Sequence, residues 1–221
     1  MRTILFDVDG TLLDTEKIYM QAWREAGALH GYTVTEDALM RTRAVNVKLA
    51  AEIFRKYCGE DFDYDKVRVD RTEISERIIA ESTPEVLLKP GAVEVLTLLK
   101  SQGRTIAAAS STSYQKTVDH LKHAGLLHFF DVIVGGDMVT CTKPDPEIFL
   151  KAAGLCGALP TDCVVVGDTP ADVLAGSAAG MDVVLIPDQV PPNEQTTALS
   201  RVILNSLSQL PHWLAELEAA Q

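Results

Sequence analysis

From residue 105 to the C-terminus, short apolar runs alternate with segments whose apolar residues recur at helical spacing. The runs predict strands at 105–109, 132–134, 163–166 and 183–186, and the pattern also admits a strand at 202–204. Helices are predicted between Pro90 and Gly103 and over 114–124, 144–153, 171–179 and 210–217, and a polar loop over 187–197. An apolar run at 4–6 predicts one earlier strand. This alternation is typical of a parallel sheet with helices on both faces, so we predict an α/β fold with a Rossmann-like, doubly wound parallel sheet.

The segment from Thr15 to about Ser82 has a different pattern, since its apolar residues form only helical stripes. Within it, residues 61–65 are predicted to be a solvated connector. Because this block directly follows the first strand, we expect a helical cap domain over 15–84, inserted into a core domain made of 1–14 and 85–221. Ligands of doubly wound sheets bind beyond the carboxyl ends of the strands, so a cap inserted there would act as a lid.

Composition narrows the function classes. The chain has 221 residues, 47% of them hydrophobic, and a formal net charge of −11. This charge argues against nucleic acid or anionic membrane as the main partner, but not against a small anionic substrate. No apolar stretch is long enough to cross a membrane, and Asp7 leaves no room for a signal peptide. The four cysteines form no C-x-x-C pair, so we expect scattered buried thiols and a cytoplasmic protein.

Polar residues follow several of the predicted strands. The first strand ends in Asp7 and Asp9, the second in the run 110–113, and the fourth in Asp168, with Asp172 one helical turn later. Lys143 follows the third strand after Gly135-Gly136-Asp137. Carboxylates are hard oxygen ligands for Mg²⁺, and hydroxyls, helix N-terminal N–H groups and a lysine bind phosphate. Each piece alone has an ordinary alternative as a turn residue, a helix cap or a surface lysine. Their convergence on one edge of the sheet favours a phosphate and Mg²⁺ site.

The same residues resemble the four ordered motifs of the haloacid dehalogenase superfamily. The matching stretches are Phe6-Asp-Val-Asp-Gly-Thr-Leu12, Ser110 at a strand end, Lys143-Pro-Asp-Pro-Glu-Ile-Phe149 and Gly167-Asp-Thr-Pro-Ala-Asp172. The resemblance covers nearly the whole chain. The insertion directly after the first motif looks like the helical-cap branch, which holds phosphatases and β-phosphoglucomutase.

The resemblance implies a role for each residue. Asp7 would be the nucleophile that forms an aspartyl-phosphate, and Asp9 the general acid and base. Mg²⁺ would lie between Asp7, the backbone carbonyl of Asp9 and Asp168, with Asp172 supporting that shell. The transferring phosphoryl group would be held by Ser110, Ser111 and Lys143. The implied activity is a Mg²⁺-dependent phosphatase for a small phosphorylated metabolite, a sugar phosphate among the candidates.

A sugar-phosphate mutase is the alternative. In the mutase subgroup we expect a histidine where Tyr19 stands and an acidic residue where Gly167 stands, so both departures favour a phosphatase. The cap residues Tyr19, Arg43 and Lys48, together with Arg41, are candidates for selecting the substrate. Ordinary solvent exposure is the alternative for the three cations.

Other functions fit less well. A dehalogenase usually lacks the second aspartate, and a catalytically dead relative would be expected to lose Asp7 or Asp168. A nucleotide-binding dehydrogenase would need a G-x-G-x-x-G after the first strand. His120 and His123, three residues apart on a predicted helix, are expected to be solvated surface residues.

Overall fold

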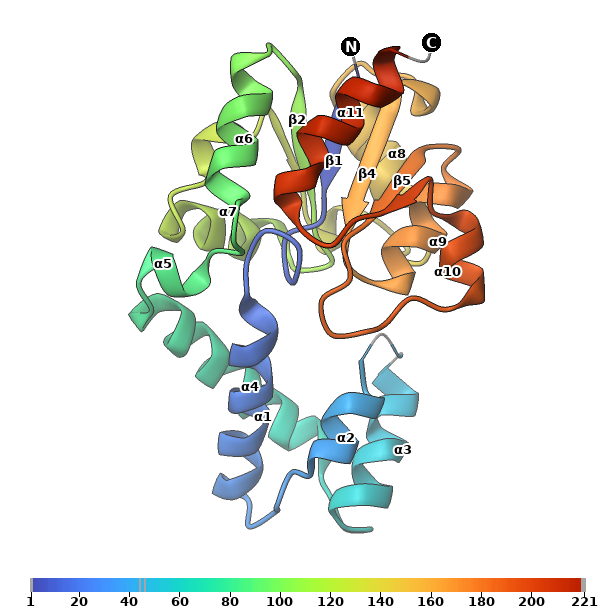
Figure 1. The fold of residues 1–221 in the computed structure, drawn as a ribbon. Helices are drawn as coiled ribbons and strands as arrows, with labels where there is room; N and C mark the ends of the chain where they lie inside the picture. Colours follow the sequence, from blue (N-terminus) through green and yellow to red (C-terminus); the bar gives the residue numbers. More distant parts are fainter. Residues whose placement is uncertain (1, 44, 46, 220–221) are drawn as a thin grey trace. The chain divides into compact units, whose positions relative to one another are not determined.

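The computed structural model describes residues 2–43, 45 and 47–219 (Figure 1). These residues form two compact units. One unit contains the residues up to Asp14 and those from Thr83 onward, and the other runs from Thr15 to Ser82. None of the helices within the described ranges combines the length and the apolar character that a membrane crossing requires.

The first unit is built on a six-stranded parallel sheet with the strand order β3-β2-β1-β4-β5-β6. The strands are β1 (Thr3–Phe6), β2 (Ile106–Ala109), β3 (Val132–Val134), β4 (Cys163–Gly167), β5 (Asp182–Leu185) and β6 (Val202–Ile203). β1 lies between β2 and β4, with Ile4 opposite Ile106 on one side and Val164 on the other. The predicted α/β fold with a Rossmann-like parallel sheet is confirmed.

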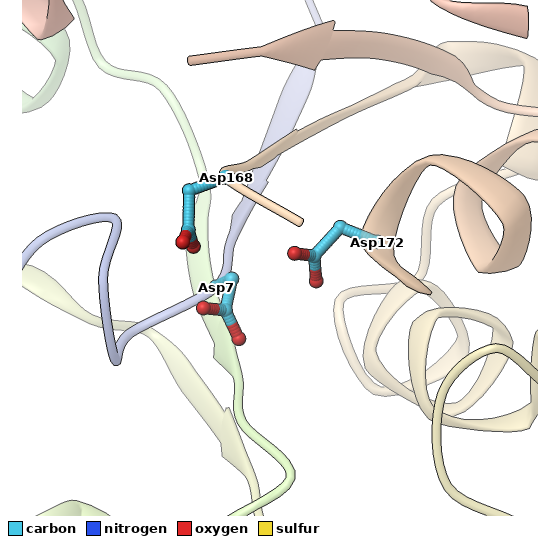
Figure 2. A group of neighbouring side chains, drawn as sticks. All are labelled: Asp7, Asp168 and Asp172. Carbon is cyan, nitrogen blue, oxygen red and sulfur yellow. The ribbon is translucent and has the colours of Figure 1, made fainter. Parts of the chain in front are cut away.

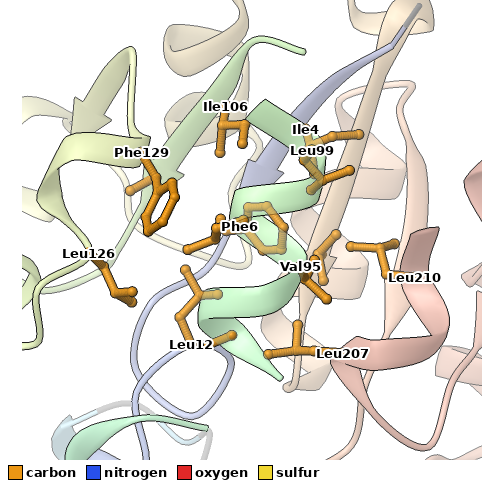
Figure 3. Close-up of a cluster of buried hydrophobic side chains, with 14 of the residues drawn as sticks. Ile4, Phe6, Leu12, Val95, Leu99, Ile106, Leu126, Phe129, Leu207 and Leu210 are labelled. Carbon is orange, nitrogen blue, oxygen red and sulfur yellow. The ribbon is translucent and has the colours of Figure 1, made fainter. Parts of the chain in front are cut away.

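Helices pack against both faces of this sheet (Figure 1). The helices in these contacts are α6 (Ala92–Ser101), α7 (Tyr114–His123), α8 (Glu147–Leu155), α9 (Pro170–Ala178) and α11 (Leu210–Ala219). The unit also contains α5 (Pro84–Leu87) and α10 (Glu194–Leu199). Because side chains alternate along a strand, Phe6 contributes to the apolar cluster that includes Leu99 of α6 and Leu210 of α11 (Figure 3). Leu5 belongs to the opposite cluster, with Phe149 of α8. Burial of each such side chain contributes about 1.5–3 kcal/mol, so β1 is anchored on both faces.

The second unit consists of α1 (Thr15–Leu29), α2 (Glu36–Arg41), α3 (Val47–Cys58) and α4 (Tyr64–Glu81). Its core contains an aromatic group in which Trp23 lies 4.4 Å from Phe54 and Phe54 lies 5.0 Å from Phe62, between ring centroids. The prediction of a solvated connector over 61–65 is wrong, because Phe62 and Tyr64 are both buried. Acidic residues alternate with these two aromatic residues in the sequence, which is why the pattern predicts a solvated loop.

Several local predictions also differ from the structure. α8 begins at Glu147 rather than at 144, because a proline disfavours helical backbone at the residue before it and Pro146 follows Asp145. The polar stretch 187–197 contains the start of α10, whose N-cap Asn193 accepts a hydrogen bond from the Thr196 backbone. This short helix has little apolar periodicity, so its caps were its main signal.

Two predictions about exposure are wrong. His120 is buried rather than solvated, because it faces inward from α7. Of the four cysteines, Cys163 is buried but Cys141 is exposed. Burial raises the pKa of the Cys163 thiol to about 11, which keeps it protonated and unreactive at neutral pH.

Candidate active site

The loop after β1 directs two aspartates to different neighbours. The backbone N–H of Asp7 donates to the Val166 carbonyl at 2.8 Å, so Asp7 continues the pairing of β1 with β4. Gly10 then adopts a φ of +87°, a left-handed conformation that favours glycine. Its N–H donates to the Leu13 carbonyl at 2.8 Å, which closes the turn. Asp7 and Asp9 both precede this turn, and their side chains have different neighbours.

Three buried carboxylates meet beyond the ends of β1 and β4 (Figure 2). Asp7, Asp168 and Asp172 each offer an oxygen, and these oxygens lie within 4.8 Å of one another. Thr11 donates its hydroxyl to Asp168 at 2.8 Å. Lys143, itself almost completely buried, forms ion pairs with Asp7 and, at 2.7 Å, with Asp172. The structure thus brings together four of the residues singled out from the sequence.

The charges of this group do not balance. Burial raises the pKa of Asp7 to about 7; Lys143 opposes this shift, and the neighbouring Asp172 adds to it. Burial alone would lower the pKa of Lys143, but Asp172 and Asp7 outweigh it and raise that pKa. One ammonium group faces three carboxylates, so negative charge remains in excess. Hard oxygen donors with surplus negative charge fit Mg²⁺.

Asp172 is held by the start of α9. Its position is the third residue of the helix, and its Oδ2 accepts from the backbone N–H of the N-cap Thr169 at 3.0 Å and from its hydroxyl at 2.6 Å. Gly167 lies against this carboxylate, because a Cβ added at residue 167 would be 2.5 Å from the Asp172 Cβ. The glycine therefore leaves the space that Asp172 occupies.

Asp9 has different neighbours from the three clustered carboxylates. Its Oδ2 accepts hydrogen bonds from the Thr112 hydroxyl at 2.9 Å and from the Ser110 hydroxyl at 3.3 Å. Among the described residues, the carboxylates that gather closely enough to share a metal ion are Asp7, Asp168 and Asp172, and the Asp9 side chain is not one of them. This separation is compatible with a metal role for the Asp9 backbone carbonyl, as the resemblance implies.

The loop after β2 is held by the end of β3. The Ser110 N–H donates to the Val134 carbonyl at 3.0 Å, and the Gly136 N–H donates to the Thr112 carbonyl at 2.8 Å. A Cβ at Gly136 would lie 2.9 Å from the Ser111 carbonyl carbon, so only glycine allows this approach. Ser111 itself is exposed. The hydroxyls and N–H groups of this loop are therefore presented from a fixed backbone.

Sequence reasoning missed three hydroxyl residues at the site. Thr11, Thr112 and Thr169 each donate a hydroxyl to one of the motif aspartates. Thr11 and Thr169 stand within the family motifs, where their proximity to an aspartate was an available signal. Thr112 pairs with an aspartate 103 positions away, so no local pattern could have identified it.

Within the helical unit, two of the candidate cap residues, Tyr19 and Arg43, line one cavity. Tyr19 and Arg43 border a hollow of about 190 Å³ together with Trp23 and Arg71. The Arg71 guanidinium lies over the Tyr19 ring, 4.3 Å from its centroid. Lys48 is exposed on α3 and is not among the residues that line this hollow.

Comparison with known proteins agrees with this geometry. Residues 1–180 match the model of the haloacid dehalogenase-like hydrolases. A phosphorylated carbohydrates phosphatase of Thermotoga maritima is 31% identical over 82% of this chain and 83% of its own length. The fructose-1-phosphate phosphatase YqaB of Escherichia coli is 32% identical over 82% and 94%.

A solved structure shows the same fold over nearly the whole chain. CbbY of Rhodobacter sphaeroides, crystallised in complex with phosphate, superposes with a TM-score of 0.77 at 27% identity, over 95% of this chain and 96% of CbbY. The match of the family model covers strands β1 to β4, the carboxylate cluster and the helical insertion. The chain belongs to the haloacid dehalogenase-like hydrolases.

Proposed function

We propose that the protein is a Mg²⁺-dependent phosphatase that hydrolyses a small phosphate monoester, such as a sugar phosphate, through an aspartyl-phosphate. The observation that carries this proposal is the buried group of Asp7, Asp168 and Asp172 in contact with Lys143. Two similar proteins are named as phosphatases of phosphorylated carbohydrates and of fructose 1-phosphate, which supports a sugar phosphate as substrate.

In the first step, a carboxylate oxygen of Asp7 forms a bond to phosphorus as the bond between phosphorus and the alcohol oxygen breaks. Asp9 transfers a proton to that oxygen, so the alcohol leaves neutral. In the second step, Asp9 takes a proton from a water molecule as the water oxygen bonds to phosphorus. The electron pair of the phosphorus–oxygen bond returns to Asp7, and inorganic phosphate is released.

Lys143 and the loop after β2 bind the phosphoryl group in this proposal. Lys143 is buried beside the nucleophile, where its ammonium group can neutralise phosphoryl oxygens in a site of low dielectric. The Ser110 hydroxyl and the Ser111 backbone supply hydrogen-bond donors from the neighbouring strand end.

Mg²⁺ would be held by Asp7, Asp168 and Asp172 together with the backbone carbonyl of Asp9. The three carboxylates fit this ion because they provide hard oxygen ligands and an excess of negative charge. The bound ion would neutralise charge, so that an anionic nucleophile can approach a phosphate dianion.

The hollow in the helical unit is the proposed recognition site for the rest of the substrate. Its aromatic rings and the guanidinium groups of Arg43 and Arg71 suit the apolar faces and hydroxyls of a sugar. Replacing Arg43 by Met is expected to raise KM for the sugar phosphate at least about tenfold, the effect of one lost charged hydrogen bond. Lys48→Met is the matched control, since Lys48 does not line the hollow, and an equal rise in its KM would contradict this assignment.

The decisive experiment measures phosphate release from a panel of phosphate monoesters, with and without Mg²⁺, alongside isomerisation of β-glucose 1-phosphate. We expect Mg²⁺-dependent release by the wild type and almost none by Asp7→Asn. Efficient isomerisation with little phosphate release would instead identify a mutase. Gly167 favours the phosphatase, because the mutase subgroup is expected to have an acidic residue at this position. A side chain there would also collide with Asp172, since an added Cβ would lie 2.5 Å from the Asp172 Cβ.

A further inference from the structure

We propose that Thr112 is a positioning residue that orients Asp9 for proton transfer to the leaving alcohol. The inference rests on the proposed phosphatase function, since it concerns the acid that this function requires. It goes beyond it by assigning a role to a side chain that touches the acid rather than the substrate.

Two hydroxyl groups hold one oxygen of the Asp9 carboxyl group. The Thr112 hydroxyl donates to Oδ2 at 2.9 Å, and the Ser110 hydroxyl donates to the same atom at 3.3 Å. The shorter bond is the stronger of the two, so Thr112 is the main restraint. Holding this oxygen limits rotation of the carboxyl group about its Cβ–Cγ bond.

The backbone of Thr112 is held by groups other than Asp9, since the preceding Ser110 N–H also donates to the Val134 carbonyl at 3.0 Å. Its N–H donates to the Ser110 hydroxyl oxygen at 3.0 Å, and its carbonyl accepts from the Gly136 N–H at 2.8 Å. Tyr114, two residues later, donates its N–H to Asp137 at 2.7 Å. The loop therefore has bonds to the end of β3 on both sides of Thr112. A hydroxyl presented from such a backbone needs no rearrangement as the reaction proceeds.

This role predicts a dependence on the leaving group. A sugar alkoxide is a poor leaving group and needs a proton as its bond to phosphorus breaks, whereas p-nitrophenolate leaves readily without one. Misplacing Asp9 should therefore slow the first step more for an alkyl phosphate than for p-nitrophenyl phosphate. The ratio kcat/KM reports this first step and is independent of the later hydrolysis of the aspartyl-phosphate.

The test compares Thr112→Val, which keeps the shape of the side chain and removes the hydroxyl, with Thr112→Ser, which keeps the hydroxyl. The substrates are p-nitrophenyl phosphate and the sugar phosphate that the wild type hydrolyses fastest. In Thr112→Val we expect kcat/KM to fall at least about tenfold more for the sugar phosphate than for p-nitrophenyl phosphate, a part of the usual factor for general acid catalysis. Thr112→Ser should restore most of this loss.

Thr196→Val is the matched control, because the buried Thr196 hydroxyl donates to the backbone carbonyl of Asn193, at 3.1 Å, rather than to a carboxylate. It should change kcat/KM for both substrates by the same factor. An equal fall for both substrates in Thr112→Val, or no recovery in Thr112→Ser, would overturn the positioning role. A wild type that releases no phosphate from any monoester would instead refute the proposed function, so the two failures are distinguishable.

Discussion

The substitution Gly10→Ala tests how closely the turn after β1 supports the carboxylate cluster. Gly10 has a φ of +87°, and a Cβ built on it would lie 2.8 Å from the Asp168 Cγ. The substitution therefore has two effects, backbone strain and displacement of a proposed metal ligand. Both can be measured separately because the chain contains a glycine that isolates the first.

That glycine is Gly103, which has a φ of +72° and open space around it, since a Cβ added there would meet no atom within 4 Å. An alanine in the left-handed conformation costs about 1–2 kcal/mol, part of which is offset by the lower entropy of the unfolded chain. Gly103→Ala should therefore lose about 1 kcal/mol of unfolding free energy. Gly10→Ala should lose roughly 3 kcal/mol, because moving Asp168 also breaks its hydrogen bond from Thr11, a charge-assisted bond of about 1.5–3 kcal/mol.

The assay combines urea unfolding of both variants with a Mg²⁺ titration of phosphatase activity. We expect the Mg²⁺ concentration for half-maximal activity to rise at least about tenfold in Gly10→Ala and to stay unchanged in Gly103→Ala. If Gly10→Ala kept the wild-type Mg²⁺ dependence while losing only as much stability as Gly103→Ala, the proposed place of Asp168 in the metal site would be refuted.

Two further predictions concern charge and stability. In the chelated, metal-free protein, the pKa of Asp7 is raised from 3.8 to about 7, mainly by burial, so its ionisation destabilises the fold as pH rises from about 4 to 7. Asp7→Asn should then be inactive but more stable than the wild type at pH 8, by up to about 4 kcal/mol, and urea unfolding should show this advantage disappearing near pH 4. Lys89, which pairs with Asp188 at 2.8 Å and Asp14 at 3.2 Å, has a pKa raised by these carboxylates against the opposing effect of burial. The stabilisation by Lys89 is therefore present at neutral pH and is lost as pH rises through that raised pKa. Lys89→Met should lower the free energy of unfolding by about 3 kcal/mol at pH 7 and by progressively less in strongly alkaline solution. A constant difference in unfolding free energy across this pH range would contradict the ion-pair explanation.

The sequence predicts the sheet better than it predicts exposure. Strands such as Val132–Val134 were expected within a residue of their observed bounds, because a buried parallel strand is a short apolar run with few alternatives. Phe62 and His120 were predicted to be exposed because their neighbours in sequence are polar, but both are buried. Burial depends on whether a side chain points toward the core of its unit. The apolar periodicity of a short segment does not determine the direction of a single side chain.

Some residues of the candidate site can be identified from the sequence, and others cannot. Asp7, Asp168, Asp172 and Lys143 were identified from the sequence because each belongs to a recognisable motif that follows a strand, and the structure places them together. Thr112 was missed because its bond to Asp9 depends on the pairing of β2 beside β1, which a local pattern does not contain.

The strand order explains how two aspartates on one strand end come to have different surroundings. β1 lies between β4 on one side and β2 on the other, so the end of β1 is flanked by carboxylates following β4 and by hydroxyls following β2. Asp7 continues the pairing with β4 and joins the carboxylates, where a cation is favoured. Asp9 accepts hydroxyl bonds from the loop after β2, where an oriented acid is favoured. The proposed nucleophile and the proposed acid share one loop, but each contacts groups that follow a different neighbouring strand. The surroundings of each can therefore be changed without altering those of the other.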